Sequence, residues 1–193
     1  MTGQAPVSAE SFVRDARRPD AGAIARIQVG RWRTGYAGLV PEEVLAELTS
    51  GEAEGRWREQ WEGSLARPPS SRHRVLVAVG GEDGGTRVVA GFASFGPATD
   101  PDRWPATDGE LYGLCVARDQ AGRGHGSRLL NAAAATMADD GFGTVSAWVL
   151  ERDAAARRFL ESAGWAADGA RRELDMGTAV PAIRLHAALD PAS

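Results

Sequence analysis

The stretch ELYGLCVARDQAGRGHGSRLLNAA, residues 110–133, decides the fold. It begins with an apolar run typical of a β-strand (residues 110–116), passes through a glycine-containing loop and continues into an Ala- and Leu-rich helix. The loop glycines are Gly122, Gly124 and Gly126. Glycines let a backbone approach an anion closely, the first N–H groups of a helix bind it, and Arg123 and Arg128 add positive charge. The loop predicts a phosphate or pyrophosphate site, although a plain strand-to-helix turn fits this loop nearly as well.

Two common nucleotide-binding motifs do not fit this loop. A dinucleotide-binding G-x-G-x-x-G pattern would place Ser127 or Leu129 where its third glycine belongs, and no βαβ unit precedes the loop. All 22 cationic side chains are arginine, so a P-loop, which needs a lysine, is excluded along with Schiff-base chemistry.

Composition predicts a single globular domain. The 193 residues are 43% hydrophobic and 25% charged, with a net charge of −4, which argues against a nucleic-acid partner. The one cysteine, Cys115, excludes an internal disulfide, and His73, His125 and His186 have no metal-ligand spacing, so no metal is expected. No apolar run is long enough to span a membrane and no signal-peptide pattern is present, so we expect a cytoplasmic protein without membrane partners.

The hydrophobic periodicity predicts an α+β domain over residues 11–190 after a loose tail at residues 1–10. The expected strands are residues 11–15, 74–80, 87–96, 110–116, 144–150, 171–176 and 182–189. The expected helices begin at Pro19 and Pro41, carry Trp57, Trp61 and Leu65 on a third segment, and cover residues 126–140 and 153–162, with Gly164 as a C-cap.

Two segments together resemble the GCN5-related N-acetyltransferases (GNAT family). The family motif Q/R-x-x-G-x-G/A falls on Ala121, Gly124 and Gly126, with Ala in place of the first Gln or Arg. A second signature, N-x-x-A-x-x-F-Y-x-x-x-G-F, has its counterpart in DAAARRFLESAGW, residues 153–165. The resemblance extends over about residues 12–189.

The resemblance implies a mixed, mostly antiparallel sheet of about six to seven strands, with a splayed central parallel pair and helices on both faces. Gly113, inside an apolar run, fits a bulge in that pair, although a small residue under a large neighbour is the alternative.

The resemblance also implies acetyl-CoA as co-substrate. Backbone groups of the strand would bind its pantetheine arm, one N–H would polarise the thioester carbonyl, and the glycine loop would hold the pyrophosphate. The residues so assigned are Leu114, Cys115, Val116, Gly122, Arg123, Gly124, His125, Gly126, Ser127, Asp153 and Phe159. Taken by themselves, His125 reads as a surface residue and Cys115 as a small buried residue rather than a nucleophile.

The implied function is transfer of the acetyl group to a primary amine of an unidentified small molecule, or to a protein N-terminus, by direct attack in a ternary complex. Glu110 is the expected general base, although a solvated charge at a strand edge is an equally open interpretation. Leu160 stands where the family has a proton-donating Tyr, which leaves Tyr36 and Ser162 as candidates. That replacement also keeps two alternatives open, a non-catalytic acyl-CoA-binding module and an interaction protein.

For the acceptor site we expect Tyr36 and Trp148 as pocket walls, and Trp57 and Trp61 as core residues. An aromatic cleft in an acidic protein suits a cationic amine of modest size. A homodimer is compatible with the sequence.

Overall fold

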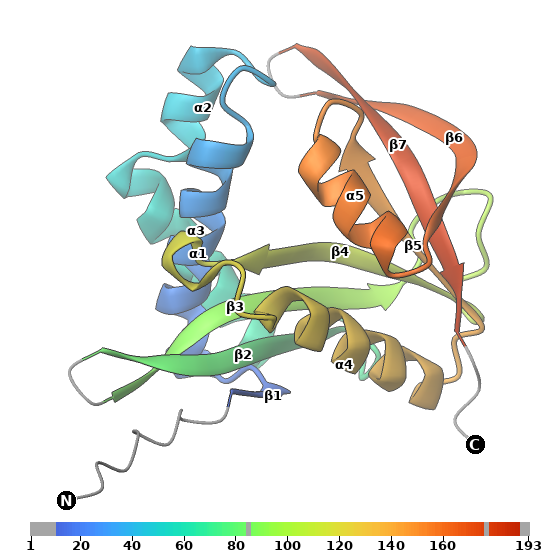
Figure 1. Ribbon diagram of the computed structural model, residues 1–193, viewed down its shortest axis with the longest axis horizontal. Helices are drawn as coiled ribbons and strands as arrows, with labels where there is room; N and C mark the ends of the chain where they lie inside the picture. The colour runs from blue at the N-terminus through green and yellow to red at the C-terminus, as the bar shows by residue number, and fades with distance from the viewer. Residues whose placement is uncertain (1–10, 84–85, 176–177, 190–193) are drawn as a thin grey trace, which may run out of the picture.

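The computed structural model describes residues 11–83, 86–175 and 178–189 (Figure 1). The expected N-terminal tail, residues 1–10, and residue 190 lie outside this part. The strands are β1 (Phe12–Asp15), β2 (Arg74–Asp83), β3 (Thr86–Pro97), β4 (Asp108–Val116), β5 (Thr144–Leu150), β6 (Ala166–Asp175) and β7 (Ala179–Ala188). The helices are α1 (Ala21–Gly35), α2 (Glu42–Leu48), α3 (Gly51–Ala66), α4 (His125–Asp139) and α5 (Ala154–Ser162), with short 3-10 turns η1 (Arg18–Asp20) and η2 (Arg118–Gln120).

The strands form one seven-stranded sheet in the order β1-β2-β3-β4-β5-β7-β6. Every neighbouring pair is antiparallel except β4 and β5. These two strands pair only where Asp108–Glu110 meets Thr144–Ser146, and they separate beyond that point. The expected mixed sheet with a splayed parallel pair is therefore confirmed.

A bulge in β4 decides which side chains face each side of the sheet. The register against β3 pairs Gly113 with Ser94 but Leu111 with Phe95, so Tyr112 is the extra residue. The bulge shifts the alternation by one position, and Leu111 and Leu114 therefore both contact the same hydrophobic core. Gly113 has no crowding neighbour, since an added Cβ would lie 3.5 Å from Ser94 Oγ. The bulge interpretation fits, and the small residue under a large neighbour does not.

Helices cover both faces of the sheet, as the resemblance implied (Figure 1). On one face α4 and α5 pack on a core that includes Phe95, Leu129 and Leu185. On the other face α1 and α3 cover a second core around Ile24 and Phe92. A third cluster joins the α1–α2 connection to the ends of β5, β6 and β7. The gap between β4 and β5 therefore lies between helices of opposite faces.

Several of the expected strand boundaries were wrong: β2 ends at Asp83 rather than at residue 80, and β7 begins at Ala179 rather than at residue 182. Strand β6 starts at Ala166, five residues before the expected start, because its first part pairs with β7 across a register shift between Ala167 and Arg171. Gly169, at φ 89°, lies in this irregular part, and such Gly- and Asp-containing stretches read as turns in a sequence. Strand β4 likewise begins at Asp108 rather than Glu110.

The C-terminal end of α5 gives a test of the predicted C-cap. Gly164 has φ 88° and its N–H donates to the carbonyl of Glu161. An added Cβ would meet no atom within 4 Å at Gly164 or at Gly63, which lies inside α3. We expect Gly164→Ala to lower the free energy of unfolding by about 1 kcal/mol through its left-handed backbone. Gly63→Ala should raise it by about 0.5–1 kcal/mol. Urea denaturation measures both, and equal effects would contradict this assignment.

Candidate functional site

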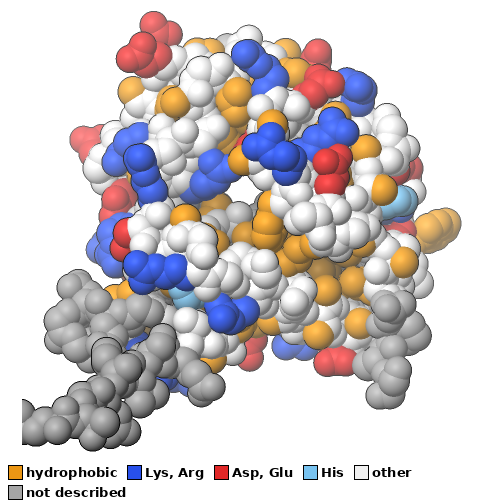
Figure 2. Space-filling model, in the orientation of Figure 1, with side chains coloured by type: hydrophobic (Ala, Val, Ile, Leu, Met, Phe, Trp, Pro, Cys, Tyr) orange, Lys and Arg blue, Asp and Glu red, His pale blue; other side chains and the backbone are white. Residues whose placement is uncertain are grey.

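A cavity of about 810 Å³ occupies the gap between β4 and β5. Its lining comes from both faces of the sheet: Gln28, Trp32 and Tyr36 belong to α1 or its end, and Phe159 and Leu160 belong to α5. Figure 2 shows the molecule hollowed at this place, with basic side chains gathered around the opening. The divergence of two strands therefore opens a passage through the sheet, reachable from either side.

The glycine loop forms one end of the cavity. Gly122 and Gly124 have φ values of 75° and 78°, which side chains rarely tolerate, and Gly124 is the N-cap of α4. Among the described residues, no oxygen accepts a hydrogen bond from the backbone N–H groups of residues 122–127. Free N–H groups at the positive end of a helix dipole form an anion site. Arg128 folds over this loop and donates to the Arg123 carbonyl at 2.9 Å.

The side chains of Arg123 and His125 do not lie where the sequence predicted them. The Arg123 guanidinium does not line the cavity and lies 3.3 Å from the Gln120 side-chain oxygen. His125 is only 2% exposed, so the surface interpretation was wrong: the first turn of α4 turns its ring inward against Gly80. Its Nδ1 has no partner among the described residues. Burial lowers the pKa of His125, and the positive charges of Arg128 and Arg123 lower it further, which disfavours the charged imidazolium.

The edge of β4 supplies free backbone groups. Ala117 N–H donates to the Ala90 carbonyl, and in an antiparallel ladder the bonded pairs alternate along the strands. The backbone N–H and carbonyl groups of Cys115 therefore form hydrogen bonds with β3, opposite Phe92. The backbone groups of Leu114 and Val116 point into the gap between β4 and β5. Cys115 contributes only its side chain to the cavity, and burial raises the pKa of this thiol to about 12. A protonated thiol is a poor nucleophile, so covalent catalysis by Cys115 is excluded.

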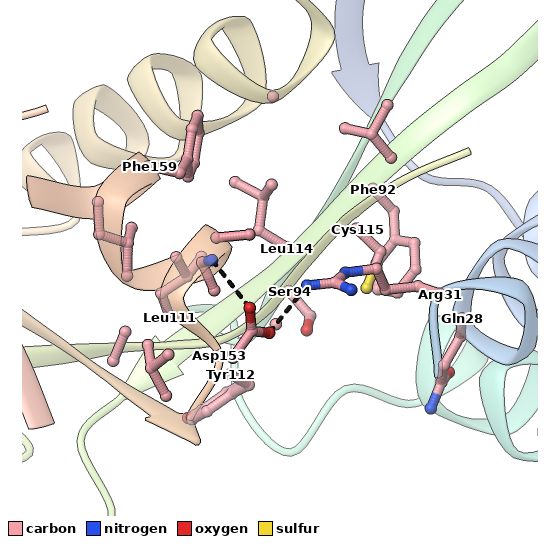
Figure 3. Close-up of a pocket in the computed structure, with 18 of the residues that line it drawn as sticks. Gln28, Arg31, Phe92, Ser94, Leu111, Tyr112, Leu114, Cys115, Asp153 and Phe159 are labelled. Atoms are coloured by element: carbon pink, nitrogen blue, oxygen red, sulfur yellow. Dashed lines mark hydrogen bonds and ion pairs between the residues drawn. The ribbon is translucent and has the colours of Figure 1, made fainter. Parts of the chain in front are cut away.

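Helix α5 closes the same end of the cavity. The Phe159 ring packs against Gly126, where an added Cβ would lie 3.4 Å from its Cζ. Asp153 caps α5 by accepting from the Ala156 N–H at 3.0 Å, and its second oxygen accepts from Arg31 of α1 at 2.8 Å. This ion pair joins the two walls across the opening (Figure 3).

Glu110 lies where β4 begins to leave β5. It is 5% exposed and lines the cavity, so the interpretation as a solvated edge charge was wrong. One oxygen, Oε2, accepts from both the N–H (3.0 Å) and the hydroxyl (2.7 Å) of Thr99. No described residue donates to the other oxygen, which leaves it available for a proton.

The remaining walls are aromatic. Tyr36 and Trp148 line the cavity as expected, but so does Trp61, which was assigned to the core. The Trp61 indole donates to Gln28 at 2.6 Å and packs edge-on against Phe92, so it serves both cavity and core. Ser162 donates to its own helix at the Phe159 carbonyl and does not line the cavity, so it is not a proton donor there.

Three residues that contribute to the site were not predicted from the sequence. Arg31, Thr99 and Arg172 belong to α1, the β3–β4 connection and β6, far apart in sequence. The signal for Arg31 is its helical spacing to Gln28 and Trp32, which share the cavity wall. Nothing local singles out Thr99 or Arg172, because only the pairing of strands brings them together.

Within residues 11–83, 86–175 and 178–189, no helix is long and apolar enough to cross a membrane. In the same residues, no group of three or more His, Cys, Asp and Glu is arranged to hold a metal ion.

Comparisons with known proteins agree on one family. The sequence model of the Acetyltransferase (GNAT) family matches residues 39–165. An N-acetyltransferase of Bacillus subtilis (strain 168), YuaI, described as uncharacterized, is 32% identical over 141 residues, covering 73% of this chain and 72% of YuaI.

Solved structures of similar fold cover nearly the whole chain. The yncA structure from Salmonella typhimurium, with its cofactor acetyl-CoA, has a TM-score of 0.67 at 21% identity, covering 96% of this chain and 97% of that one. The PaiA N-acetyltransferase from Thermoplasma acidophilum, in complex with coenzyme A, has a TM-score of 0.69 at 17% identity, covering 93% and 99%.

Proposed function

This chain belongs to the acetyltransferase (GNAT) family and is an N-acetyltransferase with acetyl-CoA as co-substrate, and we propose which of its residues carry the reaction. The acceptor in this proposal is a primary amine that attacks the thioester directly in a ternary complex. The single observation that supports it best is the gap between β4 and β5, with unpaired backbone groups on one side and a buried carboxylate at its closed end.

The glycine loop is our candidate site for the pyrophosphate of acetyl-CoA. Its free N–H groups, from Gly122 to Ser127, suit an anion, and Phe159 packs on Gly126 beside them. The YncA and PaiA structures, of similar fold, are described with acetyl-CoA and coenzyme A. The Arg31–Asp153 ion pair bridges the two walls next to this path.

The edge of β4 is our candidate site for the pantetheine arm. Leu114 and Val116 offer backbone N–H and carbonyl groups to the gap, as a missing strand would need. One of these N–H groups is placed to stabilise the negative charge that develops on the thioester carbonyl oxygen. Acetyl-CoA supplies the acetyl group as a thioester and departs as a thiol.

Glu110 is our candidate general base. An amine must lose a proton before or during its attack, and the buried carboxylate has one oxygen held by Thr99 and the other free. Glu110 lines the cavity together with Tyr36, Trp61 and Trp148, so its free oxygen is our candidate destination for the proton of the amine.

Tyr36 is our candidate for protonating the departing thiolate, in place of the family tyrosine that is Leu160 here. It lines the cavity at the end of α1, stacked on Trp32. Burial raises the pKa of its phenol, and the nearby Cys115 and Asp153 raise it further. The hydroxyl therefore stays protonated at neutral pH and can donate.

The cytoplasmic location and the homodimer stay predictions. The cationic acceptor also stays a prediction, because the lining contains two guanidinium groups, Arg31 and Arg172, and two carboxylates, Glu110 and Asp153.

The loop assignment predicts a selective loss of acetyl-CoA binding. A ligand at a hundredfold excess over its Kd stabilises the native state by about 2.7 kcal/mol, measured as a thermal shift. Gly124→Asp, which places a negative charge in the loop, should abolish this shift. Gly141→Asp is the matched control, because Gly141 also has a positive φ (85°) but lies beyond the other end of α4. A shift retained in Gly124→Asp would refute the assignment, and a wild-type protein without any shift would favour an interaction protein.

The base assignment predicts a loss of turnover without a loss of binding. Glu110→Gln keeps the shape and the Thr99 contacts but cannot take a proton, so kcat should fall by roughly 100-fold or more. Glu151→Gln, outside the cavity, is the control. Steady-state thiol release measures both variants, and an unchanged kcat would remove Glu110 from the mechanism.

The acid assignment predicts a smaller effect. A thiolate leaves without much help, so Tyr36→Phe should lower kcat by about 10-fold, below the roughly 100-fold typical of general acids. The acetyl-CoA thermal shift should persist. Tyr112→Phe is the matched control, since Tyr112 also lines the cavity but its hydroxyl donates to the Pro97 carbonyl. Equal losses in both variants would contradict a specific role for Tyr36.

A further inference from the structure

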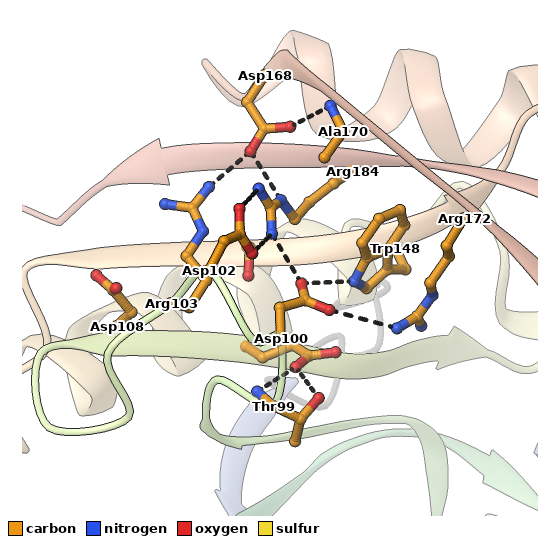
Figure 4. Close-up of polar contacts among 12 residues, drawn as sticks. Thr99, Asp100, Asp102, Arg103, Asp108, Trp148, Asp168, Ala170, Arg172 and Arg184 are labelled. Carbon is orange, nitrogen blue, oxygen red and sulfur yellow. Dashed lines mark hydrogen bonds and ion pairs between the residues drawn. The ribbon is translucent and has the colours of Figure 1, made fainter.

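Arg172 of β6 brings a positive charge to the far end of the cavity from the glycine loop. Its guanidinium carbon lies 4.2 Å from the centre of the Trp148 ring, which holds the group flat against one wall (Figure 4). Arg172 lines the cavity together with Leu174, two positions along the same strand. Arg171, on the opposite face of β6, is exposed and pairs with Glu151.

The N–H groups of Arg172 make no hydrogen bond in the described part of the chain, although Nη1 forms an ion pair with Asp100. Among the described residues, none accepts a hydrogen bond from this side chain, and its Nε is buried without a partner. Asp100 is the nearest carboxylate, at 3.6 Å, which is too long for a hydrogen bond. The other Asp100 oxygen is engaged, because it accepts from Trp148 at 2.8 Å and from Arg184 at 3.0 Å. A guanidinium whose N–H groups lack acceptors suits a carboxylate.

The same loop links this cation to the candidate base. Thr99 holds Glu110, and the next residue, Asp100, lies beside Arg172 and Trp148. Asp100 is itself fixed by Arg184, a buried side chain that also binds Asp102 and Asp168. The same loop therefore connects Glu110, a proton acceptor, with Arg172, whose guanidinium forms only a long ion pair with Asp100.

From this arrangement we propose that the acceptor is an α-amino acid whose carboxylate pairs with Arg172 while its amine faces Glu110. The inference rests on the proposed function and deepens it. In an α-amino acid the carboxylate carbon is two bonds from the reacting nitrogen. This short separation suits Glu110 and Arg172, which contact the consecutive loop residues Thr99 and Asp100. A polyamine would bring a second cation toward Arg172, and a protein N-terminus carries an amide where the carboxylate would be. Neither supplies a carboxylate to Arg172.

The test compares acids with their amides. Each of the twenty common α-amino acids and its α-amide is offered to the wild-type protein with acetyl-CoA, and thiol release gives kcat and KM. We expect at least one acid to exceed its amide by 10-fold or more in kcat/KM. Arg172→Met should raise KM for that acid by about 10- to 100-fold, the range of a lost charge-assisted hydrogen bond, with little change in kcat. Its KM for the amide should change less than twofold.

Controls separate this inference from the proposed function. Arg171→Met removes a charge from the opposite face of the same strand and should leave all constants unchanged. An acetyl-CoA thermal shift in Arg172→Met shows that the variant is folded and binds the co-substrate. Amides acetylated as well as acids, or no acid acetylated, would overturn the inference even if other amines react. The proposed function fails on a different result, the absence of thiol release with acids, amides, polyamines and peptides alike.

Discussion

The separation of β4 from β5 after only three paired residues on each strand is the constraint on which the rest of the structure depends. A sheet that opens in this way must leave backbone N–H and carbonyl groups unpaired in its interior, which is costly unless something else binds them. The gap also removes the apolar layer that would otherwise fill the centre, so helices of both faces contribute to one cavity. The break in the sheet therefore creates both the cavity and the unpaired backbone groups that a substrate would bind.

A second constraint is the fixed wall opposite the glycine loop. The connection between β3 and β4 has little regular structure, yet Arg184 ties it to the sheet through Asp100, Asp102 and the neighbouring Asp168. Hydrogen bonding to these carboxylates raises the pKa of Arg184, and the same contact lowers the pKa of Asp102 to about 2. Arg184 and Asp102 therefore stay ionised throughout the neutral range. Thr99, next to Asp100, thereby receives a fixed position from which to hold Glu110.

The sequence predicted the parts that depend on neighbours along the chain. Glycines at Gly124 and Gly164 were interpretable because turn and cap geometry depends on local backbone angles. Most strand and helix positions followed from periodicity for the same reason. The predictions that His125 lies at the surface and that Trp61 belongs to the core were wrong. Both positions depend on which face of a helix meets the sheet. The proposed role of Arg172 could not be predicted, because it arises only when β6 pairs with β7 and β7 in turn pairs with β5.

The charge pairs described above share one chemical trait: each cation is an arginine, because the chain contains no lysine. A guanidinium remains protonated at any physiological pH and is not a nucleophile toward thioesters, unlike an ε-amino group. The protein therefore handles a reactive acyl donor without exposing lysine amines of its own to it. Its ion pairs, including the bridge from Arg31 to Asp153, are resistant to self-modification by the reagent it uses.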